Sequence, residues 1–169
     1  HKITSVYADI RNVINFEVDD YFKILMKFDN GILAEVELGT YYLTDKMQDK
    51  WFERHWMIAG NKGSAYVDGF EPVGKIVRTS HLLTNVAGQR TMTAAGPTRS
   101  FGPPSEGTII TEELPSVSTK HEDYFENYKK AYAGEEEFLV QIPQTRRVLA
   151  LMAAVRESGR TGQAIAFEK

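Results

Sequence analysis

A cluster of aromatic side chains is the part of this sequence best suited to binding a polar, ring-shaped ligand. The four aromatics flank the connection 43–50, and they are Tyr41, Tyr42, Trp51 and Phe52. Their faces can stack on a sugar or polyol ring, while the phenol and indole groups offer hydrogen-bond partners. Aromatic residues are also enriched at interfaces between chains, so packing at a sheet end or in an oligomer explains the cluster equally well.

His55 is the second candidate, on a strand predicted over 52–59. A substrate contact is one interpretation, because binding residues concentrate on loops and at strand ends. The alternative is a structural contact with Asp68, which the predicted strand pairing places opposite His55. None of the four histidines forms an H-E-x-x-H pair or a metal-ligand cluster, and the chain has no cysteine. We therefore predict no metal site.

A dinucleotide-binding loop is not encoded in this chain. No two of its 13 glycines are separated by a single residue, so G-x-G-x-x-G cannot occur. The segment 60–64, Gly-Asn-Lys-Gly-Ser, superficially resembles a phosphate-binding loop, but it lacks the Walker spacing and lies between two predicted strands. Its residues are typical of a hairpin turn. No cofactor-binding residue is predicted.

Composition indicates one globular domain over residues 1–169, with 42% hydrophobic and 25% charged residues. The net charge of −3 offers no positive excess for a phosphate backbone, so we expect no nucleic-acid partner. No apolar run approaches the roughly 20 residues that span a bilayer, and no membrane partner is expected. We expect a cytoplasmic protein, although His1 does not look like a natural start and a signal could precede it.

A hairpin is predicted around the loop 29–31, and its register follows from the hydrophobic pattern. A two-residue turn would place apolar residues opposite polar ones. A three-residue loop instead pairs Met26 with Ala34 and keeps one face wholly apolar. Gly31 supplies the left-handed conformation that such a loop needs. The opposite face then carries paired charges on Lys23, Lys27, Glu35 and Glu37.

A second hairpin is predicted around the loop 60–63. A four-residue loop pairs Ile58 with Ala65. It also pairs Trp56 with Val67, and both pairs are then expected on the core face. Further strands are predicted over 3–11, 73–78, 108–114 and 164–167. Between them, 79–107 is rich in Gly, Ser, Thr and Pro and is expected to be irregular, interrupted at most by short strands.

Two helices are predicted after residue 118. Thr119 and Glu122 form a capping-box pattern, and Gly134 can end the first helix. Pro143 opens the second helix, and Gly159 is expected just after its end. The buried face of the second helix is predicted to consist of Val148, Leu151, Met152 and Val155. Strands followed by helices indicate an α+β fold, with an open, mostly antiparallel sheet and helices on one face.

Three stretches in order, 18–38, 58–64 and 147–163, resemble the C-terminal domain of Gfo/Idh/MocA-type oxidoreductases. They read Val-Asp-Asp-Tyr through the Asp-Asn-Gly turn to Glu-Leu, then Ile-Ala-Gly-Asn-Lys-Gly-Ser, then Arg-Val-Leu-Ala-Leu-Met through Ser-Gly-Arg-Thr-Gly-Gln. The resemblance covers most of the chain and rests on several moderate signals, none diagnostic alone. It implies an open sheet that covers an active site and commonly mediates homo-oligomerisation through its exposed face.

The resemblance also implies NAD or NADP as the cofactor of the full-length enzyme, bound mainly by an N-terminal Rossmann domain that this chain lacks. The family's catalytic lysine lies in a Glu-Lys-Pro motif, and its catalytic aspartate and histidine lie on a helix before the first strand of this domain. None of these motifs occurs here, so no catalytic residue is assigned. The expected substrate-binding residues, at strand ends and loops, are Tyr41, Tyr42, Trp51, Arg54 and His55.

Two functions from different classes follow. In the first, the chain is the substrate-binding and oligomerisation domain of an NAD(P)-dependent oxidoreductase acting on a sugar, polyol or related compound. The isolated chain is then expected to be inactive and to bind no nicotinamide cofactor. In the second, the chain is a stand-alone ligand-binding or dimerisation module without catalytic activity. The first is favoured, because the chain starts in mid-fold.

Overall fold

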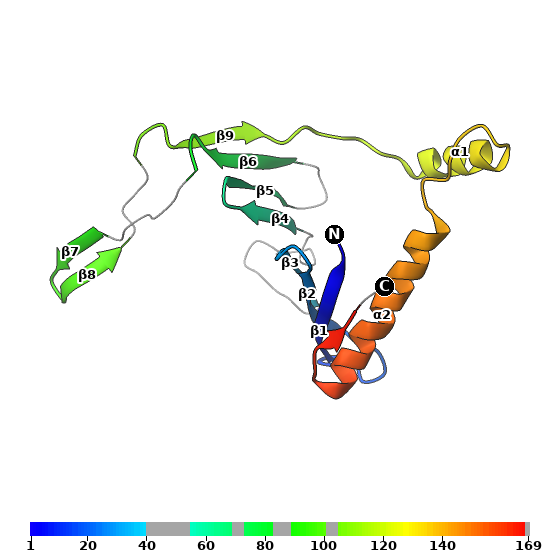
Figure 1. The fold of residues 1–169 in the computed structure, drawn as a ribbon, viewed down its shortest axis with the longest axis horizontal. Coiled ribbons are helices and arrows are strands. Elements are labelled where there is room, and N and C mark those ends of the chain that lie inside the picture. Colours follow the sequence, from blue (N-terminus) through cyan, green and yellow to red (C-terminus); the bar gives the residue numbers. More distant parts are fainter. Residues whose placement is uncertain (40–54, 69–72, 83–88, 101–104, 168–169) are drawn as a thin grey trace. The chain divides into compact units, whose positions relative to one another are not determined.

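The computed structural model describes residues 1–39, 55–68, 73–82, 89–100 and 105–167. These residues form ten strands and two helices in two compact units, each described separately below (Figure 1). The first unit comprises His1–Phe52 and Lys120–Lys169, and the second comprises Glu53–Thr119. Every strand pairing is antiparallel, which confirms the predicted α+β class.

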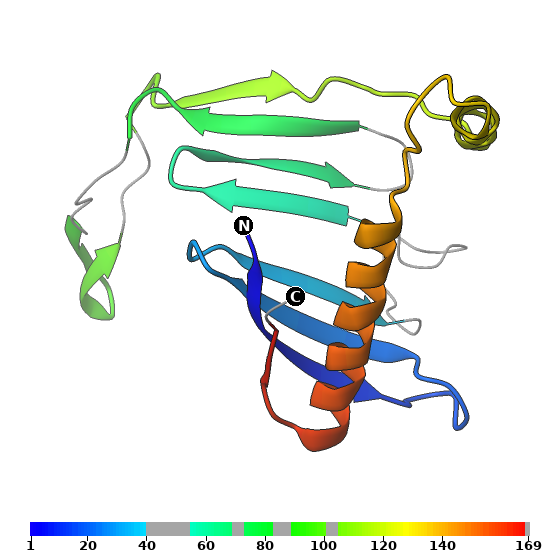
Figure 2. The ribbon, with the colours of Figure 1, turned by 45° about the vertical axis from the view of Figure 1, so that its right-hand side comes forward.

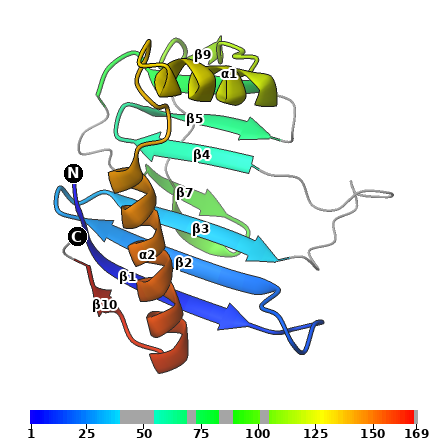
Figure 3. The same ribbon diagram turned by 90° about the vertical axis from the view of Figure 1, so that its right-hand side faces the viewer.

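The first unit is built on a four-stranded sheet in the order β10-β1-β2-β3. The strands are β1 (Ile3–Arg11), β2 (Tyr21–Phe28), β3 (Leu33–Gly39) and β10 (Ile165–Ala166). The short β10 brings the end of the chain alongside β1 (Figure 3). The first strand predicted from the sequence and the closing strand within 164–167 are both confirmed.

The β2–β3 hairpin has the predicted register. Met26 lies opposite Ala34, and the Phe28 N–H donates to the Ile32 carbonyl at 2.9 Å, which closes the three-residue loop. Gly31 has a φ of 84°, the left-handed conformation that the loop requires. Because side chains alternate along a strand, Lys23, Leu25 and Lys27 lie on the face opposite the packed residues of β2.

Helix α2 (Ile142–Thr161) lies across this sheet (Figure 2). The core consists of Ile3, Val6 and Phe167, with Ile24, Met26, Phe28, Ala150, Leu151, Ala154 and Val155 packed against it. Leu151 and Val155 were predicted correctly, but Val148 and Met152 remain at least half exposed. The true stripe continues through small residues, since Ser158 is fully buried. A prediction of the buried face of α2 from hydrophobicity alone does not identify Ser158.

The end of α2 also differs from the prediction. Gly159 lies inside the helix, which continues to Thr161 and ends at Gly162 with a φ of 68°. A Cβ on Gly159 would lie 2.8 Å from Ile10 Cδ1, so this glycine allows helix and strand to approach closely. The glycine that ends the helix is therefore the second of the two in this segment.

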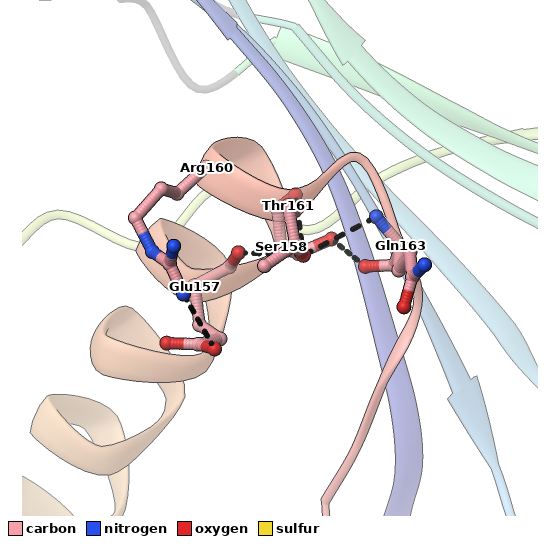
Figure 4. Close-up of polar contacts among 5 residues, drawn as sticks. All are labelled: Glu157, Ser158, Arg160, Thr161 and Gln163. Atoms are coloured by element: carbon pink, nitrogen blue, oxygen red, sulfur yellow. Dashed lines mark hydrogen bonds and ion pairs between the residues drawn. The ribbon is translucent and has the colours of Figure 1, made fainter.

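Ser158 links α2 to the edge of the sheet. Its hydroxyl accepts the Ala8 N–H at 2.8 Å and donates to the Gln163 carbonyl at 2.6 Å. Figure 4 shows this hydroxyl beside Gln163, with Thr161 and the Glu157–Arg160 ion pair nearby. Strand β10 pairs with β1 only at Ser5 and Val6, so the serine continues the link past the last paired residues.

Helix α1 (His121–Tyr132) begins one residue later than predicted. Asp123, rather than Glu122, accepts the Lys120 N–H at 2.9 Å, so the cap is Lys120 and not Thr119. Glu122 and Asp123 are both suited to a capping box. Asp123 forms it here, because it lies three positions after the cap Lys120. Tyr128 contacts the rings of Tyr132 and Phe138. Neither helix in the described residues is long and apolar enough to cross a membrane.

The second unit contains a four-stranded sheet in the order β4-β5-β6-β9. Its strands are β4 (His55–Gly60), β5 (Gly63–Asp68), β6 (Val73–Thr79) and β9 (Ile109–Glu113). Within the segment 79–107, β7 (Gln89–Thr93) and β8 (Gly96–Ser100) form a separate hairpin. The predicted strands and the interruption of the irregular segment are confirmed.

The β4–β5 register is as predicted, with Ile58 opposite Ala65 and Trp56 opposite Val67. Gly60 and Gly63 also pair, so the loop has two unpaired residues rather than four. The predicted burial is wrong, because Trp56 is 71% and Ile58 76% exposed. The described residues of the second unit include no helix that could cover this face.

Candidate functional site

The candidate site lies at the end of the first unit's sheet where β1 stops and β2 starts. Arg11, Tyr21 and Gly39 lie in one row there, paired across β1, β2 and β3. Tyr41 and Tyr42 follow Gly39 in the sequence by two and three residues. The row therefore contains the last described residue of β3, and the predicted aromatic cluster follows it in the sequence.

Most of the predicted substrate residues lie outside the described residues. They are Tyr41, Tyr42, Trp51 and Arg54. His55 is described, and it lies exposed at the start of β4 in the second unit. It pairs across the strands with Asp68, as predicted. This position is compatible both with a structural role and with a ligand contact at a strand end.

Arg11 brings a fixed positive charge to this end of the sheet. Its Nε donates to Asp9 Oδ1 at 3.0 Å, and its Nη2 donates to Asp9 Oδ2 at 2.5 Å. The guanidinium carbon also lies 5.9 Å from the centre of the Tyr21 ring, within the range of a cation–π contact. The hydrogen bonds from Arg11 lower the pKa of the Asp9 carboxyl. The pair thus stays charged near neutral pH.

Asp20 organises the loop that joins β1 to β2. Its carboxylate is almost fully buried and accepts the N–H groups of Val13 at 2.7 Å, Ile14 at 2.7 Å and Asn15 at 2.6 Å. The Asn15 side-chain amide donates as well, at 3.3 Å. Three consecutive backbone donors on one carboxylate fix the course of the loop. Charge-assisted hydrogen bonds of this kind are among the stronger ones in proteins.

The same contacts keep Asp20 ionised. Burial by itself raises the pKa of a carboxyl, because it removes the charged form from water. Here the N–H donors of Val13, Asn15 and Ile14 outweigh that effect, and the pKa of Asp20 falls below its usual value. The carboxylate is therefore ionised near neutral pH and holds the loop through its hydrogen bonds to backbone N–H groups.

Asp20 and Arg11 were not identified from the sequence. The acidic pair at 19–20, directly before a strand and after a polar connection, is a usable signal, because aspartate commonly accepts hydrogen bonds from nearby backbone N–H groups in turns. Which of the two acids turns inward depends on the register of β2. Among the described residues, no group of three or more acidic, histidine or cysteine side chains could hold a metal ion.

Comparison with known proteins finds one family model similar to the N-terminal part of this chain. A sequence model described as the GFO/IDH/MocA C-terminal domain matches residues 1–66. That match includes β1, the loop held by Asp20, the β2–β3 hairpin, all of β4 and most of β5. No curated protein matches the chain significantly.

Solved structures match over nearly the whole chain. An NAD-binding protein from Listeria innocua shares 26% sequence identity with a TM-score of 0.78, over 98% of this chain and 45% of that one. The WlbA dehydrogenase from Bordetella pertussis, in complex with NADH and UDP-GlcNAcA, shares 18% identity with a TM-score of 0.62, over 99% and 41%. An aldose-aldose oxidoreductase from Caulobacter crescentus, complexed with glycerol, shares 16% with a TM-score of 0.59, over 98% and 42%.

The fold and the sheet-end site define an α+β domain of the kind found within longer oxidoreductases. The chain spans less than half the length of these solved structures. The resemblance recognised from the sequence is confirmed: the model of the GFO/IDH/MocA C-terminal domain matches residues 1–66, and the Listeria innocua NAD-binding protein matches nearly the whole chain in structure.

Proposed function

We propose that this chain is the substrate-binding and oligomerisation domain of an NAD(P)-dependent oxidoreductase acting on a sugar, polyol or related compound. The observation that carries the proposal is the joint match to the family and to an NAD-binding protein of which the chain covers 45%. In such an enzyme, the nicotinamide cofactor supplies hydride transfer. This chain contributes the wall of the pocket, substrate contacts and exclusion of water.

The proposed substrate class has two supports. One is the nature of the candidate residues Tyr41, Tyr42, Trp51, Arg54 and His55, which combine ring faces with hydrogen-bonding groups. The other is that two solved structures of the same fold contain UDP-GlcNAcA and glycerol, respectively. A polar ring or polyol matches both supports.

The proposed oligomerisation surface is the outward face of the first unit's sheet. We call it the charged face, and it comprises Lys23, Lys27, Glu35 and Glu37 with Leu25 and Leu33. Lys23 donates to Glu37 at 3.3 Å and forms an ion pair with Glu35 at 2.9 Å. A surface that carries both signs of charge can be complementary to a copy of itself across a two-fold axis.

Substrate contact is tested in the full-length protein with the sugar or polyol that it oxidises, by following NAD(P)H absorbance. Tyr42→Phe or His55→Ala is expected to lower kcat/KM by about tenfold, because each removes one hydrogen-bonding group that is proposed to contact the substrate. Tyr132→Phe and His121→Ala, at exposed positions of α1, are the matched controls and are expected to change kcat/KM less than about twofold. Unchanged kinetics in both test variants would reject the assigned residues.

A further inference from the structure

The loop between β1 and β2 exposes apolar side chains that the described residues of the first unit leave uncovered. Phe16 is 96% exposed, an unusual position for a large aromatic side chain in a folded domain. Three other apolar residues of this short loop are between 46% and 61% exposed, namely Val13, Ile14 and Val18. Single exposed apolar residues need no explanation, but four in seven consecutive positions form a patch.

This loop is also firmly held in one conformation. Asp20 accepts hydrogen bonds from three consecutive backbone N–H groups of the loop, and its own N–H donates to the Arg11 carbonyl at 3.2 Å. Fixing the backbone costs roughly 1–2 kcal/mol per residue in conformational entropy. The buried carboxylate offsets that cost before any partner binds. A preordered loop with exposed apolar side chains is the form that a docking element takes.

The position of the loop indicates what covers it. It joins β1 to β2 at the sheet end marked by the Arg11–Tyr21–Gly39 row, and the proposed substrate residues Tyr41 and Tyr42 follow Gly39 in the sequence by two and three residues. A domain that contributes substrate contacts from this end must hold that end against the half of the enzyme that binds the cofactor. More than half of the Listeria NAD-binding protein lies outside the part shared with this chain.

We infer that residues 12–18 form a docking loop that packs against the nucleotide-binding half of the full-length protein. Phe16 is its central anchor, because buried aromatic residues contribute most where a few side chains dominate an interface. Asp20 is a positioning residue: its carboxylate accepts backbone N–H groups of the loop and so fixes the loop backbone. This inference rests on the proposed function, since it takes the partner to be a nucleotide-binding domain of the same chain.

The test is photo-crosslinking in the full-length protein, with p-benzoylphenylalanine incorporated at position 16. Irradiation is expected to join this position to a peptide of the nucleotide-binding half, identified by mass spectrometry. The matched control carries the same group at position 32. Ile32 is an apolar residue, 54% exposed, next to the turn at the opposite end of the same sheet. No link to that half is expected from position 32.

Three results would overturn the inference. A link from position 16 to a second copy of the chain would show a self-association surface instead. A link only to residues within this 169-residue segment, or no link at all, would show that the nucleotide-binding half does not cover the loop. These results do not depend on any destabilising variant, because the wild-type Asp20 is retained throughout.

The role of Asp20 is tested by Asp20→Asn in the protein that carries the crosslinker. Hydrogen exchange at the amides of Val13, Ile14 and Asn15 is expected to become about tenfold faster, because the negative charge is removed and one acceptor oxygen is replaced by an NH2 donor. The crosslink yield at position 16 should fall by about the same factor. A variant at the exposed neighbour, Asp19→Asn, is the control and should leave both unchanged. Equal effects of the two variants would reject a positioning role for Asp20.

Cofactor titration separates this inference from the proposed function. If the full-length protein binds neither NAD nor NADP, the proposed function fails regardless of the crosslinks. If it binds a cofactor and position 16 gives no link to the nucleotide-binding half, only the docking inference fails.

Discussion

At two places in the first unit, one polar side chain forms the hydrogen bonds of backbone groups that have no strand partner. Asp20 accepts three N–H groups of the β1–β2 loop, and Ser158 bridges the Ala8 N–H to the Gln163 carbonyl. Both side chains are at most 1% exposed. Buried polar groups are tolerated where they are hydrogen-bonded, and here each also fixes a segment that no strand pairing holds.

Replacement of Ser158 by alanine is expected to destabilise the chain by about 1–3 kcal/mol, because the buried Ala8 N–H loses its acceptor. Urea denaturation followed by circular dichroism measures this change. Thr161→Ala, in the same helical turn, is the control: its hydroxyl donates to the Glu157 carbonyl at 2.9 Å but is exposed. We expect it to cost less than about 0.5 kcal/mol. A loss for Ser158→Ala as small as that of the control would contradict the bridge.

At the scale of elements, the contact between α2 and β1 depends on small residues. Ala154, Ser158 and Gly159 lie where the helix approaches the strand, and Gly159 meets the Ile10 side chain. Small side chains let two backbones come close, and the large apolar residues beside them then fill the remaining space. The position of α2 on the sheet therefore depends on these residues as much as on Leu151 and Val155.

Gly159→Ala tests this close packing. The new Cβ would lie 2.8 Å from Ile10 Cδ1 and 2.9 Å from its Cγ1. Overpacking of this kind costs about 1–3 kcal/mol, although better helix propensity returns up to about 1 kcal/mol. Net destabilisation is expected in wild type, and a clearly smaller loss, or a gain, is expected in an Ile10→Ala background. Equal effects in both backgrounds would show that the two residues do not clash.

The strands were predicted well from the sequence, because the alternation of apolar and polar residues along a strand indicates which of its faces is buried. The β2–β3 register followed from keeping Met26 and Ala34 on one face, and the structure confirms it. The exposure of Trp56 and Ile58 could not be predicted, because burial depends on what covers a sheet, which strand alternation does not encode. The buried face of α2 was only partly predicted for a related reason. Ser158 is buried because its side chain is small and hydrogen-bonded, and hydrophobicity does not indicate either property.

The candidate site was harder to predict from the sequence than the fold was. Aromatic residues near a strand end suggest a ligand, but their interpretation depends on which sheet end they occupy and what faces it. The role of Asp20 could not be predicted, because the sequence does not distinguish it from the adjacent Asp19. Only the register of β2 determines which of the two side chains is buried. The role of Asp20 follows only from the three N–H groups that converge on it.

At the scale of the whole molecule, the charged face is predicted to mediate self-association. Glu35→Lys combined with Glu37→Lys would surround Lys23 with positive charge and make the face repel its copy. Dimerisation measured by sedimentation velocity is expected to weaken by at least about tenfold. The exposed intrachain ion pairs that are lost contribute little to stability, so the fold should persist.

A matched control for this prediction reverses Glu122 and Glu126, two exposed acids of α1. It introduces the same change in net charge away from the charged face and is expected to leave the association unchanged. Equal weakening by the two double variants would indicate a general effect of net charge. No weakening by the Glu35 and Glu37 reversal would remove the charged face as the interface.

Cofactor binding tests most directly whether this chain is one half of a nicotinamide-dependent enzyme. Calorimetric titration with NAD and NADP is carried out on the full-length protein and, in parallel, on the 169-residue chain. We predict that the full-length protein binds one of the two with a Kd in the micromolar range, about −8 kcal/mol. The 169-residue chain is predicted to bind neither, because it has no G-x-G-x-x-G loop. Micromolar binding by the 169-residue chain, or no binding by the full-length protein, would contradict the proposed function.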